Sequence, residues 1–208
     1  KIFLALLLTG ATYFTTFAQQ ITGENVAVAS TDAGKVRGYI NNSIFTYKGI
    51  PYAEANRFES PQKPKPWTGV RSSMTYGPVA PLLTPTNVTA AGDESEFVFN
   101  HSWGFSGEDC MRINVWTPSI SDGKKRPVMF WIHGGGFTAG SSQELPSYDG
   151  ENLAKKGDVV VVSINHRLNI LGYLDLSAYG DKYKHSANLS ILDMRVALEW
   201  VKANIANF

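Results

Sequence analysis

The stretch PVMFWIHGGGF, residues 127–137, gives the first indication of the fold. Its first six residues are continuously apolar and bulky, which is typical of a central strand in a sheet that is covered on both faces. His133 and three glycines follow directly. Glycine leaves its backbone N–H unshielded and tolerates positive φ. Glycines at the end of a strand can therefore direct two N–H groups at one point.

Two converging N–H groups are what the oxygen of a tetrahedral intermediate requires, because its charge must meet donors that are fixed before the reaction. A flexible turn and a phosphate-binding loop are the two competing interpretations. A phosphate loop would show G-x-x-x-x-G-K-[ST], or G-x-G-x-x-G at the start of a helix, and residues 134–140 contain neither pattern. A strand followed by HGGG is typical of the oxyanion loop of lipases and esterases, and we favour that interpretation.

The segments around this stretch predict an α/β fold. Residues 111–116 alternate apolar and polar side chains as a half-buried strand does, and residues 158–164 repeat the texture of a central strand. Residues 148–157 predict a short helix that ends at a glycine. A last helix is expected to begin at Asn188 or Ser190, either of which could cap it. Its apolar residues recur at steps of three and four and predict one buried face: Ile191, Met194, Leu198, Val201 and Ile205.

The N-terminal part predicts short strands and a long irregular segment. The strands are expected at residues 26–28, 35–40 and 44–47, with the Asn41-Asn42 pair as a hairpin turn between the last two. Residues 48–108 are rich in proline, glycine and polar residues, which predicts a long loop.

The composition is that of a globular protein, since 43% of the 208 residues are hydrophobic and 18% charged, a mixture too apolar for a disordered chain. The net charge of +1 gives no support for nucleic acid as a partner. Cys110 is the single cysteine, so no disulfide forms within these residues. We find no metal-binding motif, and we expect no metal or other cofactor.

Residues 1–18 have the features of a secretory signal peptide. Lys1 precedes a short apolar run, and Thr16 and Ala18 place small residues where a signal peptidase cleaves. A membrane anchor is the alternative, but the apolar run is too short and too rich in threonine to span a bilayer. We therefore expect an exported protein, secreted or periplasmic, whose mature chain begins near Gln19.

Taken together, these motifs resemble the type-B carboxylesterase and cholinesterase family of α/β-hydrolases, from about Val36 to Phe208. Each motif is weak alone, but their order and spacing are specific. They are YKGIPYA (47–53), RF (57–58) with PW (66–67), YGP (76–78), EDCMRINVWTP (108–118), PVMFWIHGGGF (127–137), VSINHRL (162–168), LGYL (171–174), and LD (192–193) leading into ALEWV (197–201).

The resemblance implies an α/β-hydrolase fold, of which residues 19–208 form the N-terminal part, and hydrolysis of small-molecule carboxylic esters by a Ser–Glu/Asp–His triad. Gly135 and Gly136 match the family's oxyanion donors. The serine would lie in a G-x-S-x-G motif beyond Phe208, and the acid and histidine would follow it. Residues 1–208 contain no such motif. No strand follows the last predicted helix, so we expect a truncated chain that is inactive by itself.

The resemblance also implies two structural ion pairs, Arg57 with Glu108 and Arg167 with Asp193, which can tie loops to the sheet. A triad role for either acid is disfavoured, because in this fold the acid follows the nucleophile. The same order disfavours a catalytic base among the four histidines, for which we expect structural or surface roles: His101, His133, His166 and His185.

The sequence departs from the family pattern at two positions, of which the first changes the structure that we expect. The family usually pairs the cysteine at position 110 with one just after the YGP motif, but Ala80 stands there. Cys110 is therefore expected to be a reduced thiol. Ser190 stands where glycine is common.

Two other functions compete with the esterase. One is a non-catalytic relative that serves binding or adhesion, since this fold has members that lost the serine. The intact HGGG sequence argues against it, because a protein that only binds has no need of an oxyanion loop. The other is a natural short product without activity, whose stable folding is doubtful because its last helix leaves the sheet open.

Overall fold

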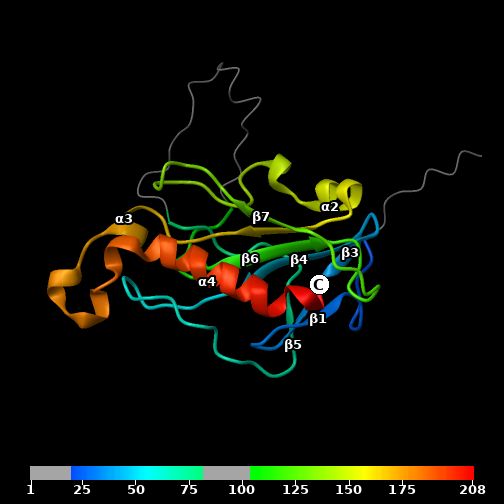
Figure 1. Ribbon diagram of the computed structural model, residues 1–208, viewed down its shortest axis with the longest axis horizontal. Helices are drawn as coiled ribbons and strands as arrows, with labels where there is room; N and C mark the ends of the chain where they lie inside the picture. The colour runs from blue at the N-terminus through cyan, green and yellow to red at the C-terminus, as the bar shows by residue number, and fades with distance from the viewer. Residues whose placement is uncertain (1–19, 82–103) are drawn as a thin grey trace, which may run out of the picture.

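The computed structural model describes residues 20–81 and 104–208. The predicted signal peptide and His101 lie outside the described residues. A five-stranded sheet runs through the centre of the molecule (Figure 1). Its strands, in spatial order, are β3 (Tyr39–Asn41), β4 (Ile44–Pro51), β6 (Arg112–Thr117), β8 (Val160–Ile164) and β7 (Val128–Ile132). All neighbouring pairs are antiparallel except β7 and β8, which are parallel.

A smaller three-stranded sheet lies beside the first. It contains β1 (Val28–Ser30), β2 (Lys35–Arg37) and β5 (Val70–Ser72). The strand predicted over residues 35–40 is therefore two strands in two sheets. They meet at Gly38, where a side chain would collide with the Thr46 carbonyl oxygen. The predicted hairpin is confirmed, although its turn residues with positive φ are Asn42 and Ser43.

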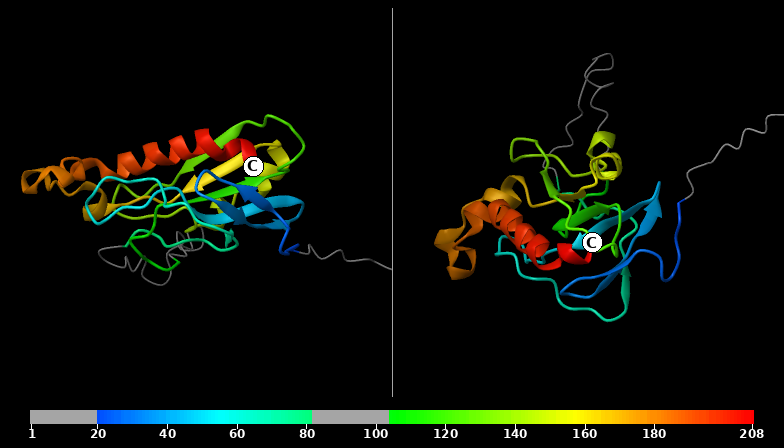
Figure 2. Two further views of the ribbon diagram at one scale, coloured as in Figure 1. Left: turned by 90° about the horizontal axis from the view of Figure 1, so that it is seen from below. Right: turned by 45° about the vertical axis from the view of Figure 1, so that its right-hand side comes forward.

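Helices cover the two faces of the large sheet. The long helix α4 (Leu189–Asn204) lies along one face, and α2 (Glu151–Gly157) lies on the other (Figures 1 and 2). The short helix α3 (Asn169–Tyr173) follows β8. Single 3-10 turns complete the list: η1 (Pro146–Tyr148), η2 (Ser177–Tyr179), η3 (Asp181–Tyr183), η4 (Ser186–Asn188) and η5 (Ile205–Asn207).

Strand β8 shows how the sequence builds both layers. Its five residues are buried, and alternate side chains point to opposite faces of the sheet. Val160 and Val162 join the cluster that contains Trp200 of α4. Val161 joins Trp116 and Ala154 of α2 on the other face. The prediction of a central strand covered on both faces is confirmed for this segment.

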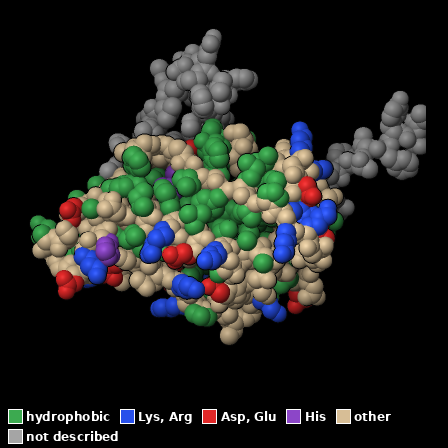
Figure 3. Space-filling model, in the orientation of Figure 1, with side chains coloured by type: hydrophobic (Ala, Val, Ile, Leu, Met, Phe, Trp, Pro, Cys, Tyr) green, Lys and Arg blue, Asp and Glu red, His purple; other side chains and the backbone are tan. Residues whose placement is uncertain are grey.

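The same prediction is wrong for β7. This strand lies at the edge of the sheet and pairs, among the described residues, with β8 alone. Four of its five side chains are 39–46% exposed: Val128, Met129, Trp131 and Ile132. An apolar run shows that a strand is suited to burial, but it does not show whether neighbours cover it. Figure 3 shows apolar side chains gathered on the face of the molecule that carries α4.

The predicted face of α4 is also partly wrong. Ile191 and Leu198 are about half exposed, whereas Met194, Val201 and Ile205 pack only at the edge of the core. The buried face includes polar residues that counting apolar positions overlooks. It consists of Leu189, Ser190, Asp193, Val196, Ala197, Trp200 and Asn204. Of the two candidate caps, Asn188 occupies the N-cap position without a side-chain capping bond, and Ser190 lies inside the helix.

No helix in the part of the chain that the structure describes has the length and apolar character needed to cross a membrane. Within those same residues, no three His, Cys, Asp or Glu side chains gather in a way that could hold a metal ion.

Candidate functional site

The predicted oxyanion loop forms a tight turn at the C-terminal end of β7. Gly135, Gly136 and Phe137 all have positive φ, at 119°, 60° and 67°. The N–H groups of Thr138 and Ala139 both donate to the carbonyl oxygen of Gly135, at 3.1 and 3.2 Å. The turn is therefore closed by main-chain hydrogen bonds of its own.

Each of the two peptide groups that carry the Gly135 and Gly136 N–H groups is held by its carbonyl oxygen. In the peptide between Gly134 and Gly135, the Gly134 oxygen contacts Nδ1 of His133 at 2.8 Å. In the next peptide, the Gly135 oxygen accepts the two turn hydrogen bonds. A trans peptide group is planar, with C=O and N–H pointing in opposite directions. Holding the two oxygens therefore directs the two N–H groups away from these contacts.

Neither N–H donates a hydrogen bond to any residue that the structure describes. Gly135 and Gly136 are both exposed. Backbone donors without a protein partner, held in place and open to a ligand, are what a developing oxyanion requires. The turn therefore presents two backbone donors that have no partner among the described residues.

The two glycines are required for different reasons. A side chain at Gly135 would place Cβ 1.8 Å from the Ala139 carbonyl oxygen, so the turn has no room for it. A side chain at Gly136 would meet nothing within 4 Å, and only its φ of 60° favours glycine there. A steric clash excludes a side chain at Gly135, whereas the backbone conformation disfavours one at Gly136.

Hydrogen bonds from buried residues hold the turn and the segment that follows it. The Phe137 carbonyl oxygen accepts a 2.7 Å bond from the N–H of Asn169, at the start of α3. After the turn, the Ser142 N–H donates to Oδ1 of Asn165 at 2.8 Å. Asn114 of β6 donates through Nδ2 to the Ser142 hydroxyl at 3.0 Å. The segment that follows the exposed turn is thus bonded to β6 and to the residues after β8.

Two histidines stack beneath the loop. The rings of His133 and His166 lie 4.7 Å apart between centroids and 14° from parallel. Both residues are buried, and neither Nε2 atom has a hydrogen-bond partner among the described residues. Burial lowers the pKa of both imidazoles, that of His166 to about 4 with a further contribution from His133. Both rings are therefore neutral at pH 7. The expected structural role fits this pair, and His185 lies exposed on the surface.

Both expected ion pairs are present, in different environments. Arg57 contacts both carboxylate oxygens of Glu108, and their side chains are 61% and 42% exposed. Arg167 binds Asp193 through Nε and Nη2 at 2.9 and 2.6 Å, with side chains 5% and 0% exposed. The second pair joins the segment after β8 to α4, within three residues of Ser190. It is part of the support of the site.

Cys110 is a free, fully buried thiol. It packs with Ala80 and Leu168, so the residue that replaces the family's second cysteine lies beside it. Burial raises the pKa of the thiol to about 12. A thiol with so high a pKa is protonated at neutral pH, and the reduced state of Cys110 stays a prediction.

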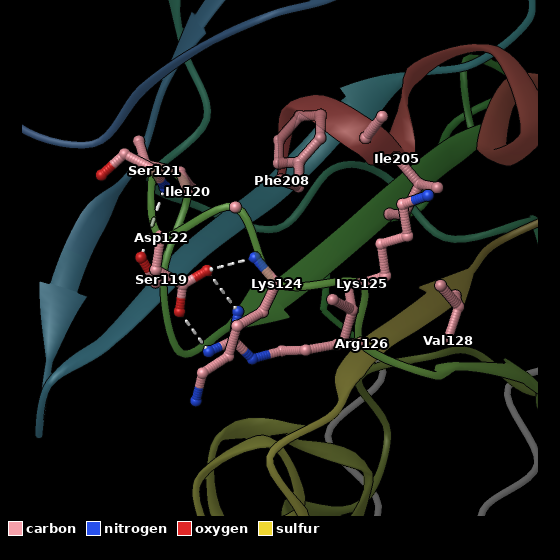
Figure 4. Close-up of a pocket in the computed structure, with 13 residues that line it drawn as sticks. Ser119, Ile120, Ser121, Asp122, Lys124, Lys125, Arg126, Val128, Ile205 and Phe208 are labelled. Atoms are coloured by element: carbon pink, nitrogen blue, oxygen red, sulfur yellow. Dashed lines mark hydrogen bonds and ion pairs between the residues drawn. The ribbon is translucent and has the colours of Figure 1, made fainter.

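Two hollows lie near the two ends of β7. An open, mainly apolar hollow of about 550 Å³ lies beside the turn and is bordered by Phe137, Ile170 and Leu174. A hollow of about 610 Å³ lies at the opposite end of the strand, where Figure 4 shows Phe208, Ile205 and Val128 around it. The second hollow is remote from the glycines and plays no part in the site.

The sequence missed the polar support of the turn. Asn114 and Asn165 occur in family motifs without an assigned role, and Ser142 lies outside every motif and predicted element. The only signal at Asn114 is its polar position in a strand predicted to alternate apolar and polar residues. Ser142 and Asn165 carry no comparable signal, because their partners are far away in the sequence.

Comparisons with known proteins identify the family of the chain. The model of the family described as "Carboxylesterase family" matches residues 25–208. The para-nitrobenzyl esterase of Bacillus subtilis is 38% identical over 188 residues, which are 87% of this chain and 35% of that protein. A solved esterase from Clostridium hathewayi, whose title reports hydrolysis of aliphatic aromatic polyesters, is 47% identical with a TM-score of 0.84, covering 92% of this chain and 37% of that one. A Geobacillus stearothermophilus carboxylesterase structure is 43% identical with a TM-score of 0.74, covering 88% and 35%. The chain thus spans about a third of the length of these relatives.

Proposed function

The chain belongs to the carboxylesterase family, and from this premise we propose that it supplies the oxyanion-binding part of a longer serine carboxylesterase. One observation carries the proposal. The N–H groups of Gly135 and Gly136 are exposed and unpaired among the described residues, and each belongs to a peptide whose carbonyl oxygen is held. The substrate class is a small carboxylic ester.

The proposed reaction is acyl transfer to serine followed by hydrolysis. The serine oxygen attacks the ester carbonyl carbon while a histidine takes the serine proton and passes it to the leaving alcohol. Negative charge then forms on the former carbonyl oxygen. The N–H groups of Gly135 and Gly136 stabilise that oxygen, and a typical oxyanion donor lowers the barrier by about 3 kcal/mol. Water then attacks the acyl carbon while the histidine takes its proton, and the proton passes to the serine oxygen as the bond to the acyl group breaks and the acid is released.

The nucleophile is proposed to lie in sequence that follows Phe208. Residues 1–208 contain no G-x-S-x-G motif, and the triad acid and histidine follow the serine in this fold. The test is to read the source DNA past the codon for Phe208. A serine flanked by glycines supports the esterase, whereas another residue in its place supports the non-catalytic binding protein.

The full-length protein is then assayed directly. We expect it to hydrolyse p-nitrophenyl acetate and butyrate, and we expect an alanine in place of the new serine to abolish the activity. A folded full-length protein with that serine present and no turnover on either ester would contradict the proposal.

The 208-residue chain by itself is expected to be inactive. It has the oxyanion donors but no nucleophile that the proposed mechanism can use. Purified to homogeneity, it should hydrolyse p-nitrophenyl acetate no faster than an equal concentration of its Gly135→Ala variant. Turnover that survives purification and depends on Gly135 would place a nucleophile within residues 1–208.

We also propose that the protein is exported, on the basis of the signal-like residues 1–18. Expression of the full-length gene should deliver a protein outside the cytoplasm whose N-terminus is Gln19. Recovery of an uncleaved chain from the cytoplasm would contradict this assignment.

A further inference from the structure

The loop glycines depend on a side chain that the reaction itself does not use. The peptide between Gly135 and Gly136 is held by main-chain bonds from Thr138 and Ala139. The peptide between Gly134 and Gly135 is held by Nδ1 of His133. A carbonyl oxygen can only accept a hydrogen bond, so Nδ1 of His133 carries the proton. The orientation of the Gly135 N–H therefore depends on one imidazole.

That imidazole is held in turn by a second one. The His133 ring stacks on His166, with 4.7 Å between centroids and 14° between the ring planes. Nδ1 of His166 lies 2.8 Å from the Ser190 hydroxyl and 3.2 Å from the Arg167 carbonyl oxygen. Ser190 belongs to the buried face of α4. The contacts therefore form a continuous path from α4 through two rings to the Gly134 carbonyl.

We propose that His133 and His166 are positioning residues of the oxyanion hole: His133 orients the Gly134–Gly135 peptide through its Nδ1–H, and His166, fixed by Ser190, holds the His133 ring. The inference rests on the proposed function, because it assigns these residues a role in that same site. Neither histidine acts as the general base. Both Nε2 atoms are buried, and in this fold the triad histidine follows the serine in the chain.

The charged groups next to the stack are paired with each other. Arg167, which follows His166, binds Asp193 of α4, and both side chains are buried. Nη1 of Arg167 also donates to the Glu59 carbonyl oxygen at 2.8 Å. This pair fixes the segment that carries His166 and does not contact His133 among the interactions found. The ring stack, and not the ion pair, is the part that reaches the loop.

The first test reads the proton on His133 and needs no activity. In the full-length protein labelled with ¹⁵N-histidine, imidazole spectra distinguish the Nδ1–H from the Nε2–H tautomer. We expect a Nδ1–H signal for His133 at pH 7, assigned by its loss in His133→Asn. An Nε2–H tautomer at this position would overturn the inference whether or not the protein hydrolyses esters.

The second test separates the hydrogen bond from the ring. His133→Phe keeps a ring for stacking and removes the donor, whereas His133→Asn places an amide N–H near the Nδ1 position. We expect His133→Phe to lower kcat by roughly tenfold to a hundredfold, less than the full loss of a donor, with KM changed by less than about threefold. We expect His133→Asn to recover most of that loss. The exposed His185→Phe is the matched control and should behave as the wild type.

A transition-state analogue distinguishes positioning from a general structural role. A trifluoromethyl ketone forms a tetrahedral oxyanion on the serine, so its inhibition constant should rise in His133→Phe by the factor by which kcat/KM falls. His166→Phe and Ser190→Ala should shift both quantities together by smaller factors. If the wild-type protein hydrolyses esters and His133→Phe keeps its kcat and its inhibitor affinity, the positioning role is refuted and the proposed esterase function still stands. If the wild type hydrolyses no ester, the proposed function fails and the tautomer decides the inference.

Discussion

The exposed turn of residues 134–138 differs from the buried polar layer beneath it in whether its hydrogen-bonding groups have partners within the protein. We define the layer as Asn114, Ser142, Asn165 and Asp193. In the layer, both ends of the Asn114 amide and both oxygens of Asp193 are bonded. In the turn, the Gly135 and Gly136 N–H groups have no partner among the described residues. The turn leaves donors free at the surface, and the layer satisfies them inside.

This difference separates stability from turnover. A donor left free at the surface costs little, because water or substrate can bind it, whereas a free polar group inside costs about 1–3 kcal/mol. Changes in the layer should therefore lower the free energy of unfolding first. Changes in the turn should lower kcat first. The predictions below test this division in the full-length protein.

The largest effect is expected in the layer. Asp193→Ala leaves the buried Arg167 guanidinium without its partner, which typically costs about 3–5 kcal/mol. Urea unfolding should show this loss. Glu108→Ala is the matched control, because it breaks the exposed pair with Arg57, and such pairs contribute about 0–1 kcal/mol. Equal losses in the two variants would contradict the distinction between the buried and the exposed pair.

The next largest effect is expected on kcat, from substitutions in the turn. Gly135→Ala forces Cβ toward the Ala139 carbonyl oxygen and should displace one donor, lowering kcat by about 10²–10³. Gly136→Ala meets no neighbouring atom and keeps only the cost of a left-handed alanine, about 1–2 kcal/mol. It should retain more activity than Gly135→Ala. The reverse order of kcat in steady-state assays would show that the two glycines are wrongly assigned.

Much of the fold could be predicted, because apolar texture and turn chemistry are local. Residues 158–164 predicted β8, and the residue pair at 41–42 predicted the β3–β4 hairpin within one position. The coverage of β7 could not be predicted, since exposure depends on which neighbours are present. The same limit applies to α4, where Ser190 and Asp193 are buried because distant residues, His166 and Arg167, bind them.

The unpaired N–H groups of the turn were predictable, but the residues that support the turn were not. Three glycines after a strand predicted free N–H groups, since this follows from glycine itself. The stack of His133 on His166 could not be predicted, because 32 residues separate the rings and no local pattern links them. Asn165 and Ser142 were missed for the same reason. Local sequence patterns indicate the glycine N–H groups, but they do not indicate the distant residues that hold the turn.

An intermediate effect is expected from acid. The pKa of His166 is lowered by burial from 6.5 to about 4, so the unfolded chain binds more protons than the folded one between these values. Stability should therefore fall as the pH drops from 6.5 to 4, by about 3 kcal/mol in all, and should fall no further on this account below pH 4. Urea midpoints measured across this range check it. His166→Phe should flatten the curve in that window, and an unchanged curve would assign the acid sensitivity to other groups.

The smallest effect is expected from removing a single hydroxyl group of the layer. Ser142→Ala removes the acceptor of one Asn114 N–H at 3.0 Å, while the other N–H still reaches Ser163. One buried donor is then unpaired, and we expect a loss of about 1 kcal/mol in unfolding free energy. The Ser142 N–H still binds Asn165, so the turn should keep its position and kcat should stay within about twofold of the wild type. Ser147→Ala, at an exposed position, is the control and should change neither quantity. A fall in kcat larger than the fall in stability would show that layer and turn are coupled at this serine, and that the division between them is less sharp than the hydrogen bonds indicate.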